Sequence, residues 1–205
     1  LAAMLGVKYT EDNKLDCLEV NCTGTKNVLE ASKTNKVKKV IFASSSEVYG
    51  EPDQNPITEK NTTKGKTLYG ISKIIGEEYC KSYSQKYNLN YTIFRFFNTY
   101  GPYQADKFVI TRFISAAMNN KNLIINGTGK QKRSYTYVDD AAKAAVIGGL
   151  SNKTNKKIFN IGNGDEPVDL LTLTKKVSKI LKKKIKIKYE KKFQNSDRKK
   201  EREIY

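Results

Sequence analysis

One stretch decides the fold: Val37-Lys38-Lys39-Val40-Ile41-Phe42-Ala43-Ser44-Ser45-Ser46-Glu47-Val48-Tyr49-Gly50. Its first half, Val37–Ala43, ends in four successive apolar residues and predicts a buried strand of the parallel type. Small hydroxyl side chains follow at once in Ser44–Gly50. Because ligands of α/β proteins bind beyond the carboxyl ends of parallel strands, this segment predicts a binding site. A serine-rich turn that binds nothing is the alternative.

A helix is expected over residues 67–86, which contain few helix breakers. It carries Tyr69 and Lys73, and a spacing of four places both side chains on one helix face, one turn apart. A free tyrosine has a pKa of about 10, but a nearby ammonium favours the phenolate and lowers that pKa. Such a pair can take a proton from a substrate hydroxyl. An exposed helix that happens to carry both residues is the alternative.

Helices and strands alternate as far as Phe97, which predicts a parallel α/β sheet. Residues 1–3 are expected to belong to a strand. Gly24 is expected to permit close packing of a helix on the sheet.

No G-x-G-x-x-G follows a strand, so the usual dinucleotide fingerprint is missing. The other expected helices cover residues 15–33, 108–119, 139–150 and 168–181, and the other expected strands cover 91–97, 123–125, 157–161 and 185–189. The polar tail from Lys191 is expected to be poorly ordered.

Composition excludes several kinds of site. The 205 residues include no histidine, which removes Ser-His-Asp catalysis and histidine-based metal sites. Cys17, Cys22 and Cys80 have no metal-ligand spacing, so no metal is expected, and an odd count without a secretory signal favours a reducing, cytoplasmic location. No apolar run reaches membrane-spanning length, so no membrane partner is expected. The net charge of +17 suits a nucleic-acid partner, but the lysines are scattered and we expect none.

Further motifs occur in a fixed order: Leu1-Ala2-Ala3, Asn21 with Gly24-Thr25, Ser44–Gly50, Tyr69 with Lys73, Arg95–Pro102, Arg133 ahead of Tyr137–Asp140, and Phe159–Gly162. Together they resemble the extended short-chain dehydrogenase/reductases, the NAD-dependent epimerase/dehydratase family that acts on nucleotide sugars. The resemblance implies an α/β fold, with the C-terminal part of a Rossmann-type doubly wound parallel sheet in residues 1–102. A smaller α/β substrate-binding lobe is implied mainly in residues 103–205, with some elements returning to the Rossmann domain.

The resemblance also implies that the family's first βαβ unit, with its glycine motif, has no counterpart here. The chain is therefore expected to be a fragment, and the isolated fragment is expected to fold poorly and to bind NAD weakly. A partner-completed lobe without catalysis is then one alternative function.

Residue roles follow from the resemblance, with NAD as the implied cofactor. Tyr69 is the base for the sugar 4-hydroxyl, Lys73 holds the nicotinamide ribose and lowers the pKa of Tyr69, and Ser45 hydrogen-bonds the reacting oxygen. The other residues implied to line the cofactor are Leu1, Ala2, Ala3, Met4, Leu5, Val20, Ser44 and Phe97. The residues implied on the substrate side are Ser45, Ser46, Glu47, Asn98, Ile124, Ile125, Asn126 and Arg133. Arginine suits a diphosphate because its forked side chain makes two charge-assisted bonds.

The reaction within the family stays open. Its dehydratases usually show Asp-Glu after the catalytic threonine, whereas this chain has Ser46-Glu47, as uronate decarboxylases do. Epimerases need only the serine, tyrosine and lysine, so a 4-epimerase acting on a UDP-hexose is favoured. A UDP-glucuronate decarboxylase or a nucleotide-sugar dehydratase is the alternative. Family members often dimerise through the helices that match residues 15–33 and 67–86, so the full-length protein is expected to be a homodimer.

Overall fold

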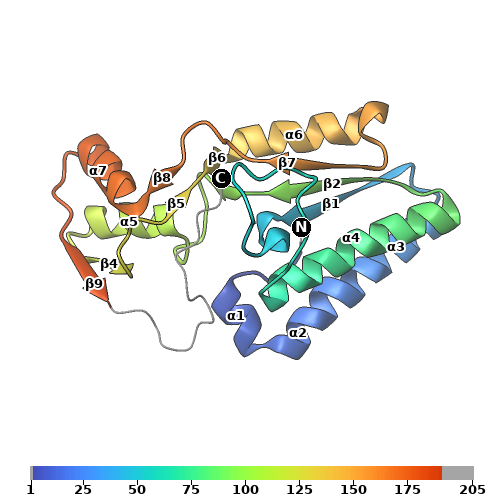
Figure 1. The fold of residues 1–205 in the computed structure, drawn as a ribbon, viewed down its shortest axis with the longest axis horizontal. Helices are drawn as coiled ribbons and strands as arrows, with labels where there is room; N and C mark the ends of the chain where they lie inside the picture. The colour runs from blue at the N-terminus through green and yellow to red at the C-terminus, as the bar shows by residue number, and fades with distance from the viewer. Residues whose placement is uncertain (1, 191–205) are drawn as a thin grey trace. The chain divides into compact units, whose positions relative to one another are not determined.

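The computed structural model describes residues 2–190, and it divides the chain into two compact units (Figure 1). Unit 1 comprises residues 1–97 and 139–162, and unit 2 comprises residues 98–138 and 163–205. Leu1, which was predicted to line a cofactor, and the polar tail from Lys191 lie outside the described residues. Each unit is built around its own apolar core, as described below.

A parallel sheet forms the centre of unit 1. Its described strands run in the order β1 (Lys39–Ser45), β2 (Asn90–Phe96) and β7 (Lys157–Ile161), all parallel. The strands predicted at 37–43, 91–97 and 157–161 are therefore confirmed, with shifts of at most two residues. The α/β fold with a parallel sheet is confirmed as well.

Helices cover both faces of this sheet (Figure 1). The helix α4 (Leu68–Tyr87) lies on the face of Phe42, and a Cβ added to Gly76 of α4 would come within 2.2 Å of the Phe42 ring. The helix α6 (Val138–Leu150) lies on the other face, where a Cβ on Gly148 would come within 2.2 Å of the Phe94 ring. Alternate strand residues point to opposite faces, so neighbouring apolar residues serve both helix layers.

The predicted helix over residues 15–33 is confirmed, but it is not uniform. It consists of α2 (Lys14–Leu18), a π-helical segment η1 (Glu19–Thr23) and α3 (Gly24–Thr34), and an unpredicted helix α1 (Val7–Asp12) precedes it. Leu29 of α3 packs in one core with Cys80 of α4 and Ile93 of β2.

Two expectations for this region are wrong. Residues 2–6 are irregular and not part of a strand. A Cβ on Gly24 would meet no atom within 4 Å, so Gly24 mediates no close packing. Glycines that do permit close approach include Gly70 and Gly76 of α4 and Gly148 of α6.

Unit 2 packs two helices against a parallel strand pair. The helices α5 (Val109–Met118) and α7 (Leu170–Leu181) share a core with β4 (Leu123–Asn126), which pairs with β9 (Ile187–Glu190). The buried members of this core are Phe113, Ala117, Leu123, Ile125, Leu173 and Val177.

Short strand pairs complete unit 2. They are β3 (Asn98–Tyr100) with β6 (Tyr135–Tyr137), and β5 (Lys132–Arg133) with β8 (Val168–Asp169). The helix predicted from residue 168 begins only at Leu170, because Asp169 caps it by accepting a hydrogen bond from Thr172 N.

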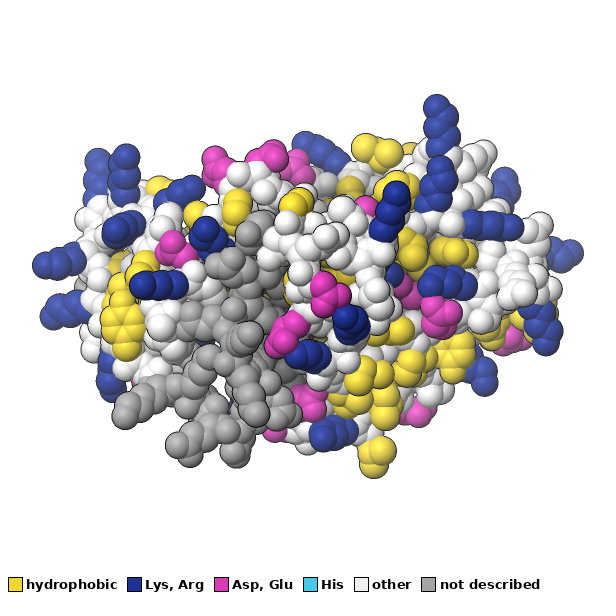
Figure 2. Space-filling model, in the orientation of Figure 1, with side chains coloured by type: hydrophobic (Ala, Val, Ile, Leu, Met, Phe, Trp, Pro, Cys, Tyr) yellow, Lys and Arg dark blue, Asp and Glu magenta, His cyan; other side chains and the backbone are white. Residues whose placement is uncertain are grey.

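The sequence carries a net charge of +17. Figure 2 shows Lys and Arg side chains dispersed over the visible face, among acidic and apolar side chains. Among the described residues, no helix combines the length and apolar character that crossing a bilayer requires.

Candidate active site

The site begins where β1 ends and α4 starts. Ser45, the last residue of β1, caps the 3₁₀ helix η2 (Ser46–Tyr49) by accepting a hydrogen bond from Glu47 N at 3.2 Å. Thr67 caps α4 in the same way, accepting from Gly70 N at 3.0 Å. A Cβ on Gly70 would lie 2.6 Å from Glu47 O, so only glycine lets these two segments approach this closely. As a result, the Tyr69 side chain reaches Ser45, whose hydroxyl acts to lower the pKa of the Tyr69 phenol.

Lys73 follows Tyr69 by one helical turn and is 7% exposed. Its Nζ donates a hydrogen bond to Ala43 O at 2.8 Å and lies 5.6 Å from the centroid of the Tyr69 ring. Ser45, Tyr69 and Lys73 therefore meet at the carboxyl end of β1, the place where parallel sheets bind ligands.

Burial shifts the pKa of both ionisable side chains. It lowers the pKa of Lys73 from 10.5 to about 8, against smaller opposite effects of the Cys17 and Cys22 thiols. Burial also raises the pKa of Tyr69, against the lowering effect of the hydrogen bond with Ser45. The expectation that Lys73 lowers the pKa of Tyr69 is not met in this structure, because desolvation dominates and the ammonium donates to a backbone carbonyl.

Asn21 ties the N-terminal loop to α4. It is 4% exposed within η1, and π-helical segments are frequent at functional sites. Its Oδ1 accepts from Met4 N at 2.8 Å, and its Nδ2 donates to Met4 O at 3.0 Å and to Ser72 Oγ at 3.1 Å. Met4 is one of the residues predicted to line the cofactor, so Asn21 holds that loop beside the residue preceding Lys73.

The residues at this edge fit the nicotinamide-ribose end of a dinucleotide. An ammonium has three donors, and among the described residues Lys73 Nζ makes one hydrogen bond, so two donors remain for ribose hydroxyls. Val20, 42% exposed on η1, has an accessible apolar side chain. Phe97 is buried. The Ser44 hydroxyl hydrogen is used within the protein, because this hydroxyl donates to Glu77 Oε1 at 2.6 Å.

The remaining predicted cofactor and sugar-side residues of unit 1 surround this edge. Ala2 is exposed, whereas Ala3 and Leu5 are partly buried. Ser46 is buried at the start of η2. Glu47 is partly buried, and its carboxylate contributes to the raised pKa of Tyr69. Glu47 therefore lies near enough to act electrostatically on the candidate base.

The predicted diphosphate residues lie in unit 2. Asn98 Nδ2 donates to Ser134 O at 3.2 Å, so Asn98 sits beside the segment that carries Arg133. Arg133 is partly buried, and its Nη1 donates to Lys132 O at 2.7 Å. The buried Ser134 Oγ has no hydrogen-bond partner among the described residues. Such an oxygen is a candidate contact for a polar ligand.

The predicted residues of β4 belong to a different strand pair of unit 2. Ile124 and Asn126 are exposed, and Ile125 between them is buried in the core. The strand therefore presents alternate residues to solvent, and Ile125 contributes only its backbone to that edge.

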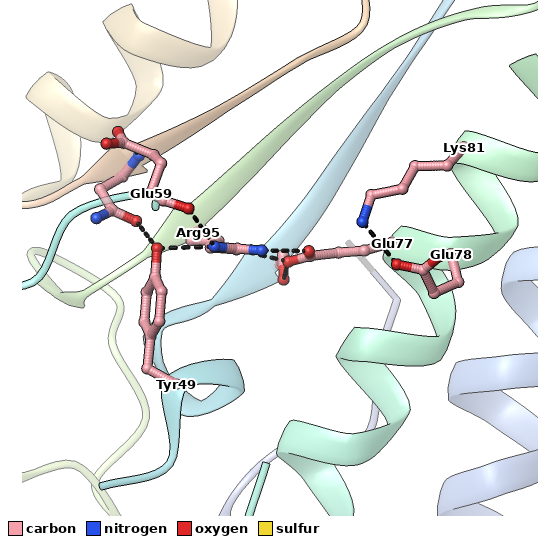
Figure 3. A network of polar contacts seen from close by, with 8 residues as sticks. Tyr49, Glu59, Glu77, Glu78, Lys81 and Arg95 are labelled. Carbon is pink, nitrogen blue, oxygen red and sulfur yellow. Dashed lines mark hydrogen bonds and ion pairs between the residues drawn. The ribbon is translucent and has the colours of Figure 1, made fainter. Parts of the chain in front are cut away.

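Two residues of the region were not predicted as functional, Glu77 and Arg95. They form a buried ion pair beside Ser44, shown in Figure 3. The sequence contains one signal for Glu77, because it continues the spacing of four that links Tyr69 and Lys73. That spacing predicts the helix face on which Glu77 lies. It does not reveal that the partner of Glu77 is Arg95 on β2.

Comparison with known proteins gives consistent matches. The sequence model described as the NAD dependent epimerase/dehydratase family matches residues 1–162. UDP-N-acetyl-alpha-D-glucosaminuronate decarboxylase of Bacillus cytotoxicus is 42% identical over 196 residues, which are 88% of this chain and 60% of that protein. A putative UDP-glucose 4-epimerase of Methanocaldococcus jannaschii is 38% identical over 169 residues, which are 80% of this chain and 54% of that protein.

Solved structures are similar over nearly the whole chain. UDP-N-acetylglucosamine 4-epimerase from Methanobrevibacter ruminantium, in complex with UDP-N-acetylmuramic acid, gives a TM-score of 0.90 at 32% identity and covers 96% of this chain and 64% of its own. UDP-glucose 4-epimerase from Thermotoga maritima, with UDP-glucose, gives 0.90 at 28% identity and covers 95% and 64%. The chain thus spans less than two thirds of the length of these proteins.

Proposed function

The chain belongs to the NAD-dependent epimerase/dehydratase family, and we propose that the protein inverts C4 of a UDP-hexose as an NAD-dependent 4-epimerase. The observation that carries the proposal is the meeting of Ser45, Tyr69 and Lys73 at the carboxyl end of β1. The two solved structures described above are named as 4-epimerases, which supports the same reaction class.

The chemistry needs one base and one hydroxyl donor. NAD, when bound, would supply the hydride acceptor for sugar C4 and the hydride donor for the return to the opposite face of the sugar. Tyr69 removes the proton of the 4-hydroxyl, and the Ser45 hydroxyl beside Tyr69 holds that oxygen in line. Lys73 binds the ribose with its remaining donors. On the return step Tyr69 gives the proton back to the C4 oxygen.

The UDP part is assigned to unit 2. Arg133 and Asn98 bind the diphosphate, next to the buried Ser134 Oγ, which has no hydrogen-bond partner within residues 2–190. The exposed edge at Ile124–Asn126 contributes backbone groups on the substrate side. The homodimer through the helices at residues 15–33 and 67–86 and the cytoplasmic location remain predictions from the sequence.

A second candidate is a decarboxylase of a UDP-uronate, favoured by a specific observation. Glu47 follows Ser46, as in uronate decarboxylases, and the decarboxylase of B. cytotoxicus is 42% identical to this chain. The first step is the same, because a ketone at C4 lies β to the C6 carboxylate. The C5–C6 bond would then break, CO₂ would leave with the C6 carbon, and C5 would take up a proton.

One experiment tests the shared step and separates the two reactions. The full-length protein is given NAD with a UDP-hexose or with the matching UDP-uronate, and the products are followed by NMR. Formation of the C4 epimer supports the epimerase, and formation of CO₂ with a UDP-pentose supports the decarboxylase.

The variant Tyr69→Phe then tests the base. Its turnover should fall by roughly 10²–10⁴, with NAD affinity and melting temperature nearly unchanged. A folded Tyr69→Phe protein that keeps most of its activity would remove Tyr69 from the mechanism.

A further inference from the structure

Three side chains of α4, spaced four residues apart, each meet the end of β1. These pairs are Tyr69 with Ser45, Lys73 Nζ with Ala43 O at 2.8 Å, and Glu77 Oε1 with Ser44 Oγ at 2.6 Å. The first two pairs belong to the site already described. The third pair has no part in the proposed chemistry, although Glu77 is only 1% exposed.

Glu77 is held by a second strand. Arg95 of β2, 3% exposed, donates from Nε to Glu77 Oε1 at 2.9 Å and from Nη2 to Glu77 Oε2 at 2.6 Å (Figure 3). This forked arrangement restricts both the distance and the angle between helix and strand. It therefore adds a directional restraint on the rotation of α4 to the restraint from packing, since the hydrophobic effect itself is non-directional.

The same network continues to the segment after Ser45. Ser44, Arg95 and Asn160 stand opposite one another in the register of β1, β2 and β7. Tyr49 Oη, on η2, accepts from Arg95 Nη1 at 2.9 Å and donates to Asn160 Oδ1 at 2.7 Å. Figure 3 shows Arg95 between Glu77 of α4 and Tyr49 of η2. One guanidinium thus links the helix that carries Tyr69 to the short helix that Ser45 caps.

We propose that Glu77 and Arg95 are positioning residues, which lock α4 and η2 onto the sheet so that the hydroxyls of Tyr69 and Ser45 stay side by side. The inference rests on the proposed function, because it assigns this pair to the same reaction. Stability alone does not account for the pair, since replacing a buried ion pair with apolar side chains is often neutral or stabilising. Apolar side chains at these two positions could not supply the directional contact that Glu77 and Arg95 make between α4 and β2.

The experiment uses the full-length protein and a matched control. Glu77→Gln removes the charge but keeps the shape and an oxygen that can accept from Ser44. Glu78→Gln is the control, because Glu78 is the next residue of α4, 61% exposed and paired with Lys81. Glu77→Gln should lower kcat by about 10- to 100-fold and leave KM for the UDP-sugar within about threefold, since small misplacements of reacting groups have effects of this size. Glu78→Gln should leave both constants unchanged.

Two further variants separate positioning from folding. The double variant Glu77→Leu with Arg95→Met replaces the pair by apolar residues, and it should fold while keeping a low kcat. In the Tyr69→Phe background, Glu77→Gln should lower the residual kcat by less than about twofold, because both changes act on one hydroxyl pair. Full kcat in the folded double variant, or an undiminished Glu77→Gln effect in the Tyr69→Phe background, would overturn the inference.

A readout that does not depend on activity completes the test. Amide hydrogen exchange at residues 69–73 should be at least about fivefold faster in Glu77→Gln than in Glu78→Gln, because the first turns of α4 lose their tether. Equal exchange in the two variants would count against the inference. If the unsubstituted protein converts no UDP-sugar, the proposed function fails, and the exchange comparison still decides whether the pair holds the site together.

Discussion

Replacing Lys73 with methionine should stabilise the folded protein although it removes a proposed active-site group. Lys73 is 7% exposed, and burial lowers its pKa from 10.5 to about 8. Burying the charged Lys73 ammonium therefore lowers the free energy of unfolding, because the ammonium is fully hydrated in the unfolded chain. Methionine has a similar length and carries no charge, so this cost disappears.

The magnitude follows from the two pKa values. The difference between 10.5 and about 8 corresponds to about 3.4 kcal/mol at pH 7. The variant also loses the hydrogen bond from Nζ to Ala43 O, which is worth about 1 kcal/mol. We expect the free energy of unfolding to rise by about 2 kcal/mol at pH 7.

The gain should depend on pH with a definite sign. Between pH 8 and 10.5 the unfolded chain still binds the Lys73 proton and the folded protein does not, so the stability of the unsubstituted protein rises with pH in this window. The methionine variant lacks that rise. Its advantage should shrink by about 2.5 kcal/mol from pH 7 to pH 10 and end near zero.

Urea unfolding of the full-length protein at pH 7, 8.5 and 10 measures this difference. Lys143→Met is the control, because it makes the same substitution at a side chain that is 74% exposed on α6. A Lys73→Met protein that is less stable at pH 7, or that differs from the unsubstituted protein by the same amount at every pH, would refute the reasoning.

Three further changes test packing, capping and binding. Gly76→Ala should cost about 1–3 kcal/mol of unfolding free energy, because its Cβ would lie 2.2 Å from the Phe42 ring; chemical denaturation measures it. Thr67→Ala should cost about 1 kcal/mol in the same assay, because Gly70 N loses its cap. Arg133→Ala should weaken UDP binding by calorimetry, and Arg133→Lys should restore only part, because lysine lacks the forked contact. Unchanged UDP affinity in the alanine variant would leave Arg133 a structural role only.

The accuracy of the sequence predictions varies along the chain for physical reasons. The strand at 157–161 matches β7, and the helix at 67–86 differs from α4 by one residue at each end, because periodicity and caps are local signals. The helix α1 was missed, since its six residues are too few to show a period. Gly24 was misinterpreted because a glycine in a helix does not reveal whether anything approaches it.

The sequence by itself determined which residues share an element and a face. Tyr69 and Lys73 lie one turn apart because four residues make about one helical turn, whatever surrounds the helix. Only the tertiary structure decided which groups meet across elements, such as Ser45 with Tyr69 and Glu77 with Arg95. It also decided that the pKa of Tyr69 is raised. Desolvation depends on all the atoms that folding packs around a group, and the sequence spacing of two residues does not contain that information.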